Sequence, residues 1–216
     1  MPRNPVPSSI FKTSIAAEEI ESMPLCTFPG EIHVIDREGR ELNRAISYLK
    51  EQKMIGFDTE SRPVFSPGQR NHGVALLQLS GPDHAFLFRT QKIGMPKGLC
   101  KIMASKDILK IGAAVRDDVR GLQRFNRFDP HGYVDLQSIA WEWGIKDKSV
   151  KKLAANVLHR KVSKTQQLSN WEADELTSAQ KMYSATDAWV CLEMYRKLLA
   201  TPKSPLGVEN LEISGQ

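Results

Sequence analysis

Cysteine is scarce in this sequence, and its placement excludes two classes of small stabilised protein. Among 216 residues only Cys26, Cys100 and Cys191 occur, widely spaced and without a CxxC pair. Three isolated thiols predict neither a disulfide framework nor a cysteine-ligated zinc site. They are typical of reduced thiols in an intracellular protein.

Long apolar runs are absent as well. No segment approaches the roughly 18 consecutive apolar residues of a membrane-spanning helix, and the N-terminus lacks the apolar core of a secretory signal. Internal repeats are lacking too, and an apolar content of 41% is ordinary for a globular protein. We expect a soluble protein of the cytoplasm or the nucleus, depending on the source organism, with no membrane partner.

The formal net charge is +5, which suits a polyanionic partner such as nucleic acid without requiring one. Basic side chains gather in two segments. Four arginines recur at helical spacing between residues 116 and 127, and further lysines and arginines crowd residues 146–164. These segments are either two solvated helix faces or two walls along a phosphate backbone.

Proline content and apolar periodicity divide the chain into three parts. Residues 1–30 contain five prolines and little periodicity, which predicts an N-terminal arm, loosely ordered or wrapped over the surface, with a short helix near residues 14–22. We expect a single domain over residues 31–200, a size that one core can fill. Residues 201–216 are expected to form a flexible tail.

The pattern of apolar residues predicts a mixed α/β fold. Strands are expected at residues 31–36, 54–58, 73–80, 84–88, 108–114 and 133–136. Helices are expected at 42–49, 99–103 and 117–125, and over most of residues 136–199 with a break near 168–171. A loop occupies residues 61–68, and the turn at 81–83 makes its two flanking strands an antiparallel hairpin. A mixed sheet flanked by helices follows from this order.

Asp58 and Glu60 stand at the end of the apolar run 54–57. In an extended strand, residues i and i+2 project from the same face, so the two acids converge at the C-terminal end of the strand. Such a pair can hold a hard cation, although an acidic triplet is more commonly the solvated end of a strand.

A second acidic position follows the strand predicted at 108–114, where a helix begins. A carboxylate in the first helical turn can reach back toward the strand ends, and Asp117 and Asp118 compete for this role. Asp118 shares a helix face with Leu122, whereas Asp117 points about a quarter turn away. We favour Asp118 and interpret Asp117 as an N-terminal helix cap.

Tyr183 and Asp187 lie one turn apart on a predicted helix and face the same way. A core tyrosine beside an exposed acid is the commoner explanation of such a pair. The helix is rich in Ala, Met, Leu and Trp, however, so Asp187 has little free surface. A carboxylate in that position needs a partner, and a metal ion is one.

Taken in order, Phe57-Asp58-Thr59-Glu60, Gly112-x-x-Val115-x-x-Asp118-x-x-x-Leu122 and Tyr183-x-x-x-Asp187 resemble the three motifs of the DEDD superfamily of 3'-5' exonucleases. The tyrosine is typical of the DEDDy branch, which includes ribonuclease D and the exonuclease domain of the Werner-syndrome helicase. The resemblance extends over residues 31–199. It implies a ribonuclease H-like fold, an α/β fold with a five-stranded mixed sheet that is flanked by helices and has an antiparallel second strand.

The resemblance also implies the chemistry. Asp58, Glu60, Asp118 and Asp187 would hold two divalent metal ions, Mg²⁺ or Mn²⁺, since oxygen ligands suit these ions better than zinc and the sequence shows no Cys/His cluster. Tyr183 would orient the attacking water. The expected reaction is two-metal hydrolysis of phosphodiester bonds at the 3' end of single-stranded DNA or RNA, which releases nucleoside 5'-monophosphates.

Two other functions fit part of the pattern. One is a non-catalytic nucleic-acid-binding module with the same fold, against which four carboxylates facing a phosphate argue. The other is a metal-dependent hydrolase of small phosphoesters. The family members named above carry further domains, whereas we expect a free-standing catalytic domain here. The sequence indicates neither an RNA or DNA preference nor any protein partner.

The resemblance indicates substrate contacts less specifically than it indicates the metal ligands. The candidates are Phe57, Thr59, Leu77, Gln78, Arg62, Lys164 and Gln167. Packing in the core explains Phe57 and Leu77 equally well. We interpret Trp171 as a structural wedge before the last helix rather than a platform for base stacking.

Overall fold

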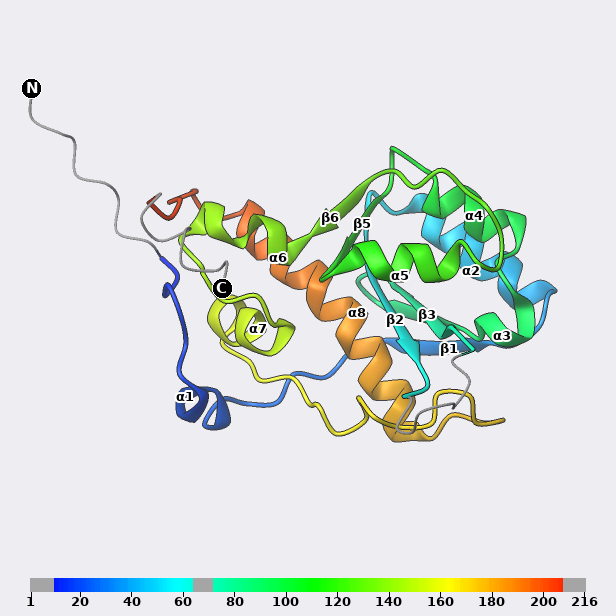
Figure 1. Cartoon of the computed structure of the whole chain (residues 1–216), viewed down its shortest axis with the longest axis horizontal. Helices are drawn as coiled ribbons and strands as arrows, with labels where there is room; N and C mark the ends of the chain where they lie inside the picture. The colour runs from blue at the N-terminus through cyan, green and yellow to red at the C-terminus, as the bar shows by residue number, and fades with distance from the viewer. Residues whose placement is uncertain (1–9, 64–71, 208–216) are drawn as a thin grey trace, which may run out of the picture.

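The computed structural model describes residues 10–63 and 72–207; most of the predicted loop at 61–68 and the end of the predicted tail lie outside these ranges. The centre is a six-stranded mixed sheet in the order β1-β4-β3-β2-β5-β6 (Figure 1). The strands are β1 (Glu31–Ile35), β2 (Met54–Ser61), β3 (Val74–Ser80), β4 (His84–Phe88), β5 (Leu109–Gly112) and β6 (Tyr133–Asp135). All six lie where the apolar pattern predicts them.

The number of strands corrects the five-stranded sheet that the resemblance implies. β3 runs antiparallel to β2 and β4, whereas the other adjacent pairs are parallel. The five strands from β2 onward have the expected arrangement, with the second of them antiparallel. β1 is the additional strand, and it extends the edge by pairing with β4 from Glu31 opposite His84 to Ile35 opposite Phe88.

The helices are α1 (Ala17–Glu21), α2 (Arg40–Glu51), α3 (Thr90–Ile93), α4 (Lys97–Met103), α5 (Val115–Leu122), α6 (Leu136–Ile139), the 3₁₀ helix η1 (Ala140–Trp143), α7 (Val150–Leu158) and α8 (Ser178–Leu199). The main correction concerns residues 159–177, which contain no helix. His159 ends α7 in a left-handed conformation with φ 54°, and Thr177 begins α8 with a capping box. None of these helices, in the described part of the chain, is long and apolar enough to cross a membrane.

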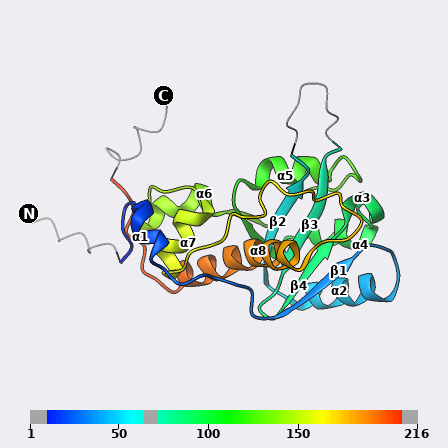
Figure 2. The same cartoon turned by 90° about the horizontal axis from the view of Figure 1, so that it is seen from below.

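Helices cover both faces of the sheet. α2, α4 and α5 pack on one face around a core that includes Leu49, Leu99 and Leu122. α8 crosses the other face, where it contacts β1 to β5, and α7 packs against α8. Figure 2 shows α5 and α8 on opposite sides of the sheet. The face under α8 and the face under α2 and α5 are called the α8 face and the α2 face below.

α8 lies directly on β2 because Gly56 has no side chain. A Cβ atom at this position would come within 1.9 Å of the carbonyl oxygen of Ala188. The backbone of the helix therefore rests on the backbone of the strand, next to Asp187 on α8 and close to Asp58 on β2. This contact sets the distance between the two elements that carry three of the four predicted acids.

Residues 10–30 follow the surface along α7 and α8 and bury apolar side chains on the way. Phe11, Ile15, Ile20, Cys26 and Phe28 are each at most 8% exposed and pack mainly against residues of these two helices. Where it is described, the N-terminal arm is thus wrapped over the surface. The division of the chain at residues 30 and 200 stays a prediction.

Candidate active site

Three carboxylates meet where β2 passes under α8. Asp58 and Glu60 project from the α8 face of the strand, and Asp187 comes from the helix above it. Carboxylate oxygens of the three residues lie within 4.8 Å of one another. The pairing of β2 with β3 shifts register between Glu60 and Ser61, an irregularity of the kind found beside active sites. The structure therefore brings together three of the four predicted acids.

The first turn of α8 sets the direction of the side chains that follow it. Gln180 N donates to Thr177 Oγ1 at 3.2 Å, and Thr177 N donates to Gln180 Oε1 at 3.0 Å. Gln180 Nε2 also donates to Ser169 Oγ at 2.9 Å, which ties the helix to the loop before it. Because this reciprocal cap fixes where the helix begins, Tyr183 and Asp187 face the sheet one turn apart.

Asp118, the fourth acid, approaches β2 from α5. Ala114 adopts a left-handed conformation (φ 56°, ψ 35°) that turns the chain sharply from β5 into α5. Asp135 Oδ1 accepts a hydrogen bond of 3.1 Å from Ala114 N, which supports this strained residue. Thr59 Oγ1 then donates to Asp118 Oδ1 at 2.5 Å. Asp118 is thereby held against the strand residue that separates the two β2 acids.

Asp117 points away from the site. Its side chain is 89% exposed and pairs with Arg120 at 3.4 Å. Its interpretation as a helix cap is wrong, because the N-cap of α5 is Ala114 and no side chain caps that end. Of the two neighbouring acids, only Asp118 contacts β2 through Thr59.

Burial and crowding raise the pKa values of all four acids. Burial, followed by the charges of Asp58 and Asp187, raises the pKa of Glu60 to about 9. Burial also raises the pKa of Asp118 and that of Asp187 to about 6, and it raises the pKa of Asp58 well above its usual range. The ammonium of Lys164 opposes the shifts at Asp58, Glu60 and Asp187. One exposed lysine cannot balance four acids, so the site favours additional positive charge.

Tyr183 is buried beside the acids and is held by an aromatic neighbour. It is 6% exposed, and its ring centroid lies 5.9 Å from that of Trp171. Trp171 is fully buried, as a structural wedge would be. Burial, followed by the carboxylates of Asp187 and Glu60, raises the pKa of Tyr183. The phenol therefore stays protonated at neutral pH, which suits a hydrogen-bonding group better than a base.

The donor set fits hard divalent cations. Each acid offers carboxylate oxygen, which Mg²⁺ and Mn²⁺ prefer. The spacing of Asp58, Glu60 and Asp187 allows one cation to contact all three. Asp118 lies outside that group but is close enough for its charge to raise the pKa of Asp58. A cation shared by Asp58 and Asp118 would relieve that repulsion.

The structure does not support substrate contacts by Phe57 and Leu77. They are 1% and 0% exposed and pack in the core of the α2 face, because alternate residues of a strand point to opposite faces. Gln78, which pairs with Asp58 across β2 and β3, is also 0% exposed, and neither polar atom of its amide has a hydrogen-bond partner. None of these three side chains is accessible from the surface in this structure.

The other predicted substrate residues are accessible. Lys164 and Gln167 are exposed in the segment before α8, and Lys164 lies within electrostatic reach of three acids. Arg62 is also exposed and pairs with Glu172 at 3.4 Å. Thr59 contacts Asp118. Their roles toward a nucleic acid stay predictions.

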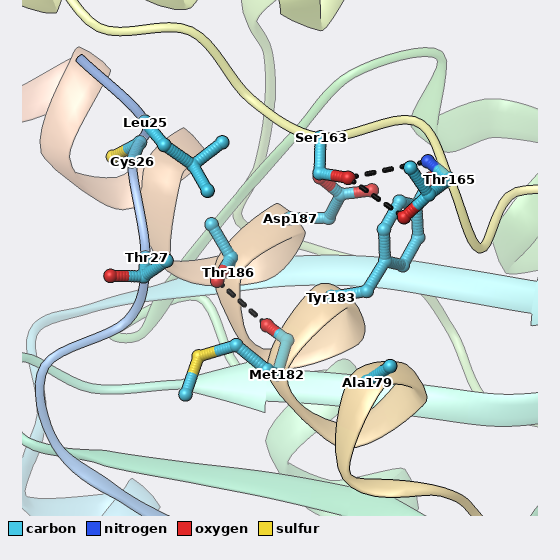
Figure 3. Close-up of a pocket in the computed structure, with 10 residues that line it drawn as sticks. All are labelled: Leu25, Cys26, Thr27, Ser163, Thr165, Ala179, Met182, Tyr183, Thr186 and Asp187. Atoms are coloured by element: carbon cyan, nitrogen blue, oxygen red, sulfur yellow. Dashed lines mark hydrogen bonds between the residues drawn. The ribbon is translucent and has the colours of Figure 1, made fainter.

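A pocket of about 170 Å³ adjoins Tyr183 and Asp187 (Figure 3). Residues 25–27 form one wall, Ser163 and Thr165 another, and α8 the floor. Hydrogen bonds anchor the first wall, from Cys26 N to the carbonyl oxygen of Lys161 at 2.8 Å and from Phe28 N to Thr186 Oγ1 at 3.0 Å. The sequence gives no signal for residues 25–27, because they carry no motif and lie far from Tyr183 along the chain.

A second, wider pocket of about 460 Å³ lies beside Asp118 and is lined by Arg120 and Arg124. Both arginines belong to the basic segment 116–127. α5 ends at Leu122, so Arg124 lies beyond the helix and the predicted single helical row of arginines is interrupted.

The basic segment 146–164 is partly neutralised. Lys151 pairs with Glu21 at 2.8 Å, and Lys152 pairs with Asp147 at 3.0 Å. Glu21 also lies 3.8 Å from Lys161. These lysines serve the packing of the N-terminal residues on α7, whereas Lys164 faces the acids.

The segment that carries the four acids and Tyr183 is shared with known proteins. A family model described as 3'-5' exonuclease matches residues 33–201. This chain belongs to the 3'-5' exonuclease family. The resemblance to DEDD-type exonucleases is thereby confirmed.

Curated members of the family are similar over most of this chain. The bifunctional 3'-5' exonuclease/ATP-dependent helicase WRN of Mus musculus is 32% identical over 193 residues, which cover 82% of this chain and 13% of that protein. Exonuclease 3'-5' domain-containing protein 2 of Homo sapiens is 31% identical over 170 residues, which cover 73% of this chain and 27% of that protein. The chain therefore spans less than a third of either relative.

Solved structures share the fold. The EXO domain of Aedes aegypti Nibbler superposes with a TM-score of 0.70 at 25% identity, covering 81% of this chain and 91% of that one. Escherichia coli RNase D superposes with a TM-score of 0.69 at 22% identity, covering 79% and 44%. The expected ribonuclease H-like fold is confirmed, with one strand more than the resemblance implied.

Proposed function

We propose that this member of the 3'-5' exonuclease family hydrolyses phosphodiester bonds at the 3' end of single-stranded DNA or RNA and releases nucleoside 5'-monophosphates. The observation that carries the proposal is the convergence of Asp58, Glu60 and Asp187, with Asp118 held beside them. A surface that only binds nucleic acid gains nothing from carboxylates, because they repel the phosphates.

The acids are the residues that would hold two Mg²⁺ or Mn²⁺ ions. Asp58, Glu60 and Asp187 would hold one ion, and Asp58 with Asp118 the other. When bound, the ions would activate a water molecule and offset the charge on the phosphoryl and leaving oxygens. The hydroxyl of Thr59 fixes the direction of the Asp118 carboxylate through its hydrogen bond of 2.5 Å.

Tyr183 would position the attacking water. Its raised pKa keeps the hydroxyl protonated, so it can donate or accept a hydrogen bond but does not remove the proton at neutral pH. The packing of its ring on Trp171 limits rotation of the side chain. Its place one helical turn before Asp187 keeps the hydroxyl near the acids.

The two pockets suit different parts of a nucleic-acid end. The pocket beside Tyr183 includes Leu25 and Met182, apolar side chains suited to a nucleoside. The pocket beside Asp118 includes Arg120 and Arg124, which suit phosphates. This arrangement supports a terminal nucleotide on the Tyr183 side and the remaining strand on the Asp118 side.

The test is a cleavage assay on 5'-labelled RNA and DNA of matched sequence, single-stranded and duplex, with Mg²⁺ or Mn²⁺. We expect single strands to shorten from the 3' end, with mononucleotide as the product, and EDTA or Asp58→Asn to abolish the reaction. If no strand shortens, the proposal is wrong. Binding in EDTA without cleavage after metal is restored would favour the binding module, and faster turnover of a mononucleotide ester would favour a small-phosphoester hydrolase.

A pair of neighbouring variants tests the assignment of Asp118. We expect Asp118→Asn to lower the cleavage rate by about a hundredfold, because the change removes a ligand. Asp117→Asn removes the same charge from the neighbouring residue, whose side chain is exposed. We expect the cleavage rate of this variant to change by no more than about twofold. Equal losses in the two variants, measured by initial rates at saturating Mn²⁺, would contradict the assignment.

A further inference from the structure

A second group of potential ligands lies at the edge of the sheet, on the α2 face. Glu31 and His33 are two residues apart on β1 and share a face, and strand pairing puts His84 of β4 opposite Glu31. One ligand atom from each side chain lies within 4.8 Å of the others. The sequence shows no such cluster, because His33 and His84 are 51 positions apart and meet only through the pairing of β1 with β4.

The distances within this group are near those of a metal site. His33 Nε2 and His84 Nδ1 are 2.9 Å apart, and Glu31 Oε2 lies 3.7 Å from the first and 3.9 Å from the second. Ligand atoms at about 2.0–2.1 Å from a tetrahedral ion are roughly 3.3 Å from one another. Small rotations suffice to reach this geometry, because the Glu31 side chain is 75% exposed and free to move inward.

Aromatic packing holds both imidazole rings while leaving their nitrogens accessible. His33 stacks on Phe86 with ring centroids 5.1 Å apart, and Tyr48 meets His84 edge-on at 4.9 Å. The two histidine side chains are 30% and 31% exposed. An ion can therefore approach from solvent without displacing the packed side of either ring.

Asp83 supports His84 from the opposite side of its ring. One oxygen of Asp83 accepts a hydrogen bond from the hydroxyl of Tyr48, and the other lies 4.0 Å from His84 Nε2. This distance is too long for a hydrogen bond, but a small rotation of the carboxylate would let it accept one from Nε2 and leave the Nδ1 lone pair free, as in many metal-binding histidines. Burial and the neighbouring His84 lower the pKa of His33 against the influence of nearby glutamates, which favours the neutral form that binds metal.

We propose that Glu31, His33 and His84 form a binding site for a divalent transition-metal ion, with zinc as the best match. Two imidazole nitrogens and one carboxylate form a ligand set that zinc takes, with water in the fourth position. The site lies on the opposite face of the sheet from Asp58 and differs from the acid cluster in ligand chemistry. Mg²⁺ prefers oxygen ligands and does not compete for it. A bound ion would join the edge strand β1 to β4.

The test is a zinc titration of protein that has been stripped with EDTA and then supplied with excess Mg²⁺, in a variant whose acid cluster is disabled by Asp58→Asn and Asp187→Asn. We expect one equivalent of Zn²⁺ to bind, and Co²⁺ to give the visible absorption of a nitrogen- and oxygen-ligated ion at the same stoichiometry. His33→Gln and His84→Gln should each weaken zinc binding by at least about tenfold. If no equivalent of Zn²⁺ binds, the proposal is overturned.

Two further variants make the result specific. His131 also lies beside a carboxylate, Asp129 at 2.9 Å, and its side chain is 36% exposed, so His131→Gln is a matched control that should leave zinc binding unchanged. Glu31→Gln changes an exposed side chain and should weaken zinc binding while the metal-free protein keeps its Tm. Zinc binding that is unaffected by Glu31→Gln and His84→Gln, or equally affected by His131→Gln, would show that the histidines only hydrogen-bond to each other.

Discussion

At the scale of single residues, the neighbours of the acids decide which carboxylates can act. Asp117 and Asp118 are adjacent and chemically identical, yet only Asp118 accepts a hydrogen bond from Thr59. Asp117 pairs with Arg120 in solvent. A hydroxyl on the strand therefore distinguishes two side chains that differ by about 100° around a helix.

Tyr183 can be tested by removing one oxygen atom. We expect Tyr183→Phe to lower the cleavage rate by about a hundredfold, because the water near the acids loses a positioned hydrogen-bonding group. Affinity for Mn²⁺ should change little, since the carboxylates remain. Rates would come from single-turnover cleavage and affinities from Mn²⁺ titration. Tyr195→Phe is the control, because Tyr195 lies on the same helix but packs against the core away from the acids; an unchanged rate in Tyr183→Phe would remove Tyr183 from the mechanism.

The sequence predicted single residues well only where local geometry determined them. The spacing of Asp58 and Glu60 on a strand, and of Tyr183 and Asp187 on a helix, was enough to place each pair on one face. The motif leaves Phe57 open between a substrate contact and core packing, because a motif does not distinguish a ligand from its alternating neighbour; the structure places Phe57 in the core. The pairing of His33 with His84 depends on the register of β1 and β4, which no short motif encodes.

At the scale of elements, the site depends on how closely α8 approaches β2. Gly56 permits backbone contact with Ala188, and this contact places the acid of the helix against those of the strand. α8 also contacts five strands, so its position is determined over its length. The separation between the acids is thus a property of two packed elements and not of flexible loops.

Gly56→Ala tests this dependence. A methyl group there would meet a helix carbonyl at 1.9 Å, so we expect the free energy of unfolding to fall by about 1–3 kcal/mol. The cleavage rate should fall by more than the loss of folded protein accounts for, because a displaced α8 moves Asp187 away from Asp58. Both quantities can be measured by urea denaturation and by cleavage rates at temperatures where the variant is folded.

Gly98→Ala is the matched control for this change. Its new methyl group would meet the Cδ1 atom at the flexible end of Ile46 at 2.4 Å, which can rotate away at little cost. We expect near-normal stability and full activity. If Gly56→Ala and Gly98→Ala behave alike, close packing of α8 on β2 is not what positions the acids.

The sequence predicts helices and strands where the apolar periodicity is strong. It does not predict helix ends that are set by capping. The six strands follow apolar runs and lie where those runs predict them. Residues 159–177 were expected to be mostly helical, but His159 and Thr177 end one helix and begin the next through local backbone and side-chain geometry. Periodicity alone does not reveal such boundaries.

At the scale of the whole molecule, the acid cluster links stability to pH, and the proposed metal ions would change that link. Without metal, Glu60 has a pKa of about 9 in the folded protein against an ordinary value of 4.5. The folded state therefore holds a proton that the unfolded state releases between these values. The contribution of this proton to stability is complete below the unfolded-state pKa of 4.5 and is lost as the pH rises through the folded-state pKa of about 9. A cation held by the acids would take the place of the proton and remove this loss.

We therefore expect the rise in Tm on adding Mg²⁺ or Mn²⁺ to grow as the pH is raised from about 5 to about 8. Thermal unfolding followed by fluorescence, with metal or with EDTA at each pH, measures this difference. Glu60→Gln removes one titrating group and should reduce the dependence in EDTA, although Asp118 and Asp187, with pKa values of about 6, still titrate in this range. A metal-induced increment that is the same at both ends of the range would contradict the linkage.

The wall formed by residues 25–27 has a consequence for how members of this family can diverge. These residues line the pocket beside Tyr183, yet they precede the segment 33–201 that the family shares. Part of the surface proposed to meet the end of the strand therefore lies outside the shared segment, whereas the four acids and Tyr183 lie inside it. On the proposed function, a change in this leading segment would alter selectivity for one kind of 3' end over another while the four proposed metal ligands stay the same.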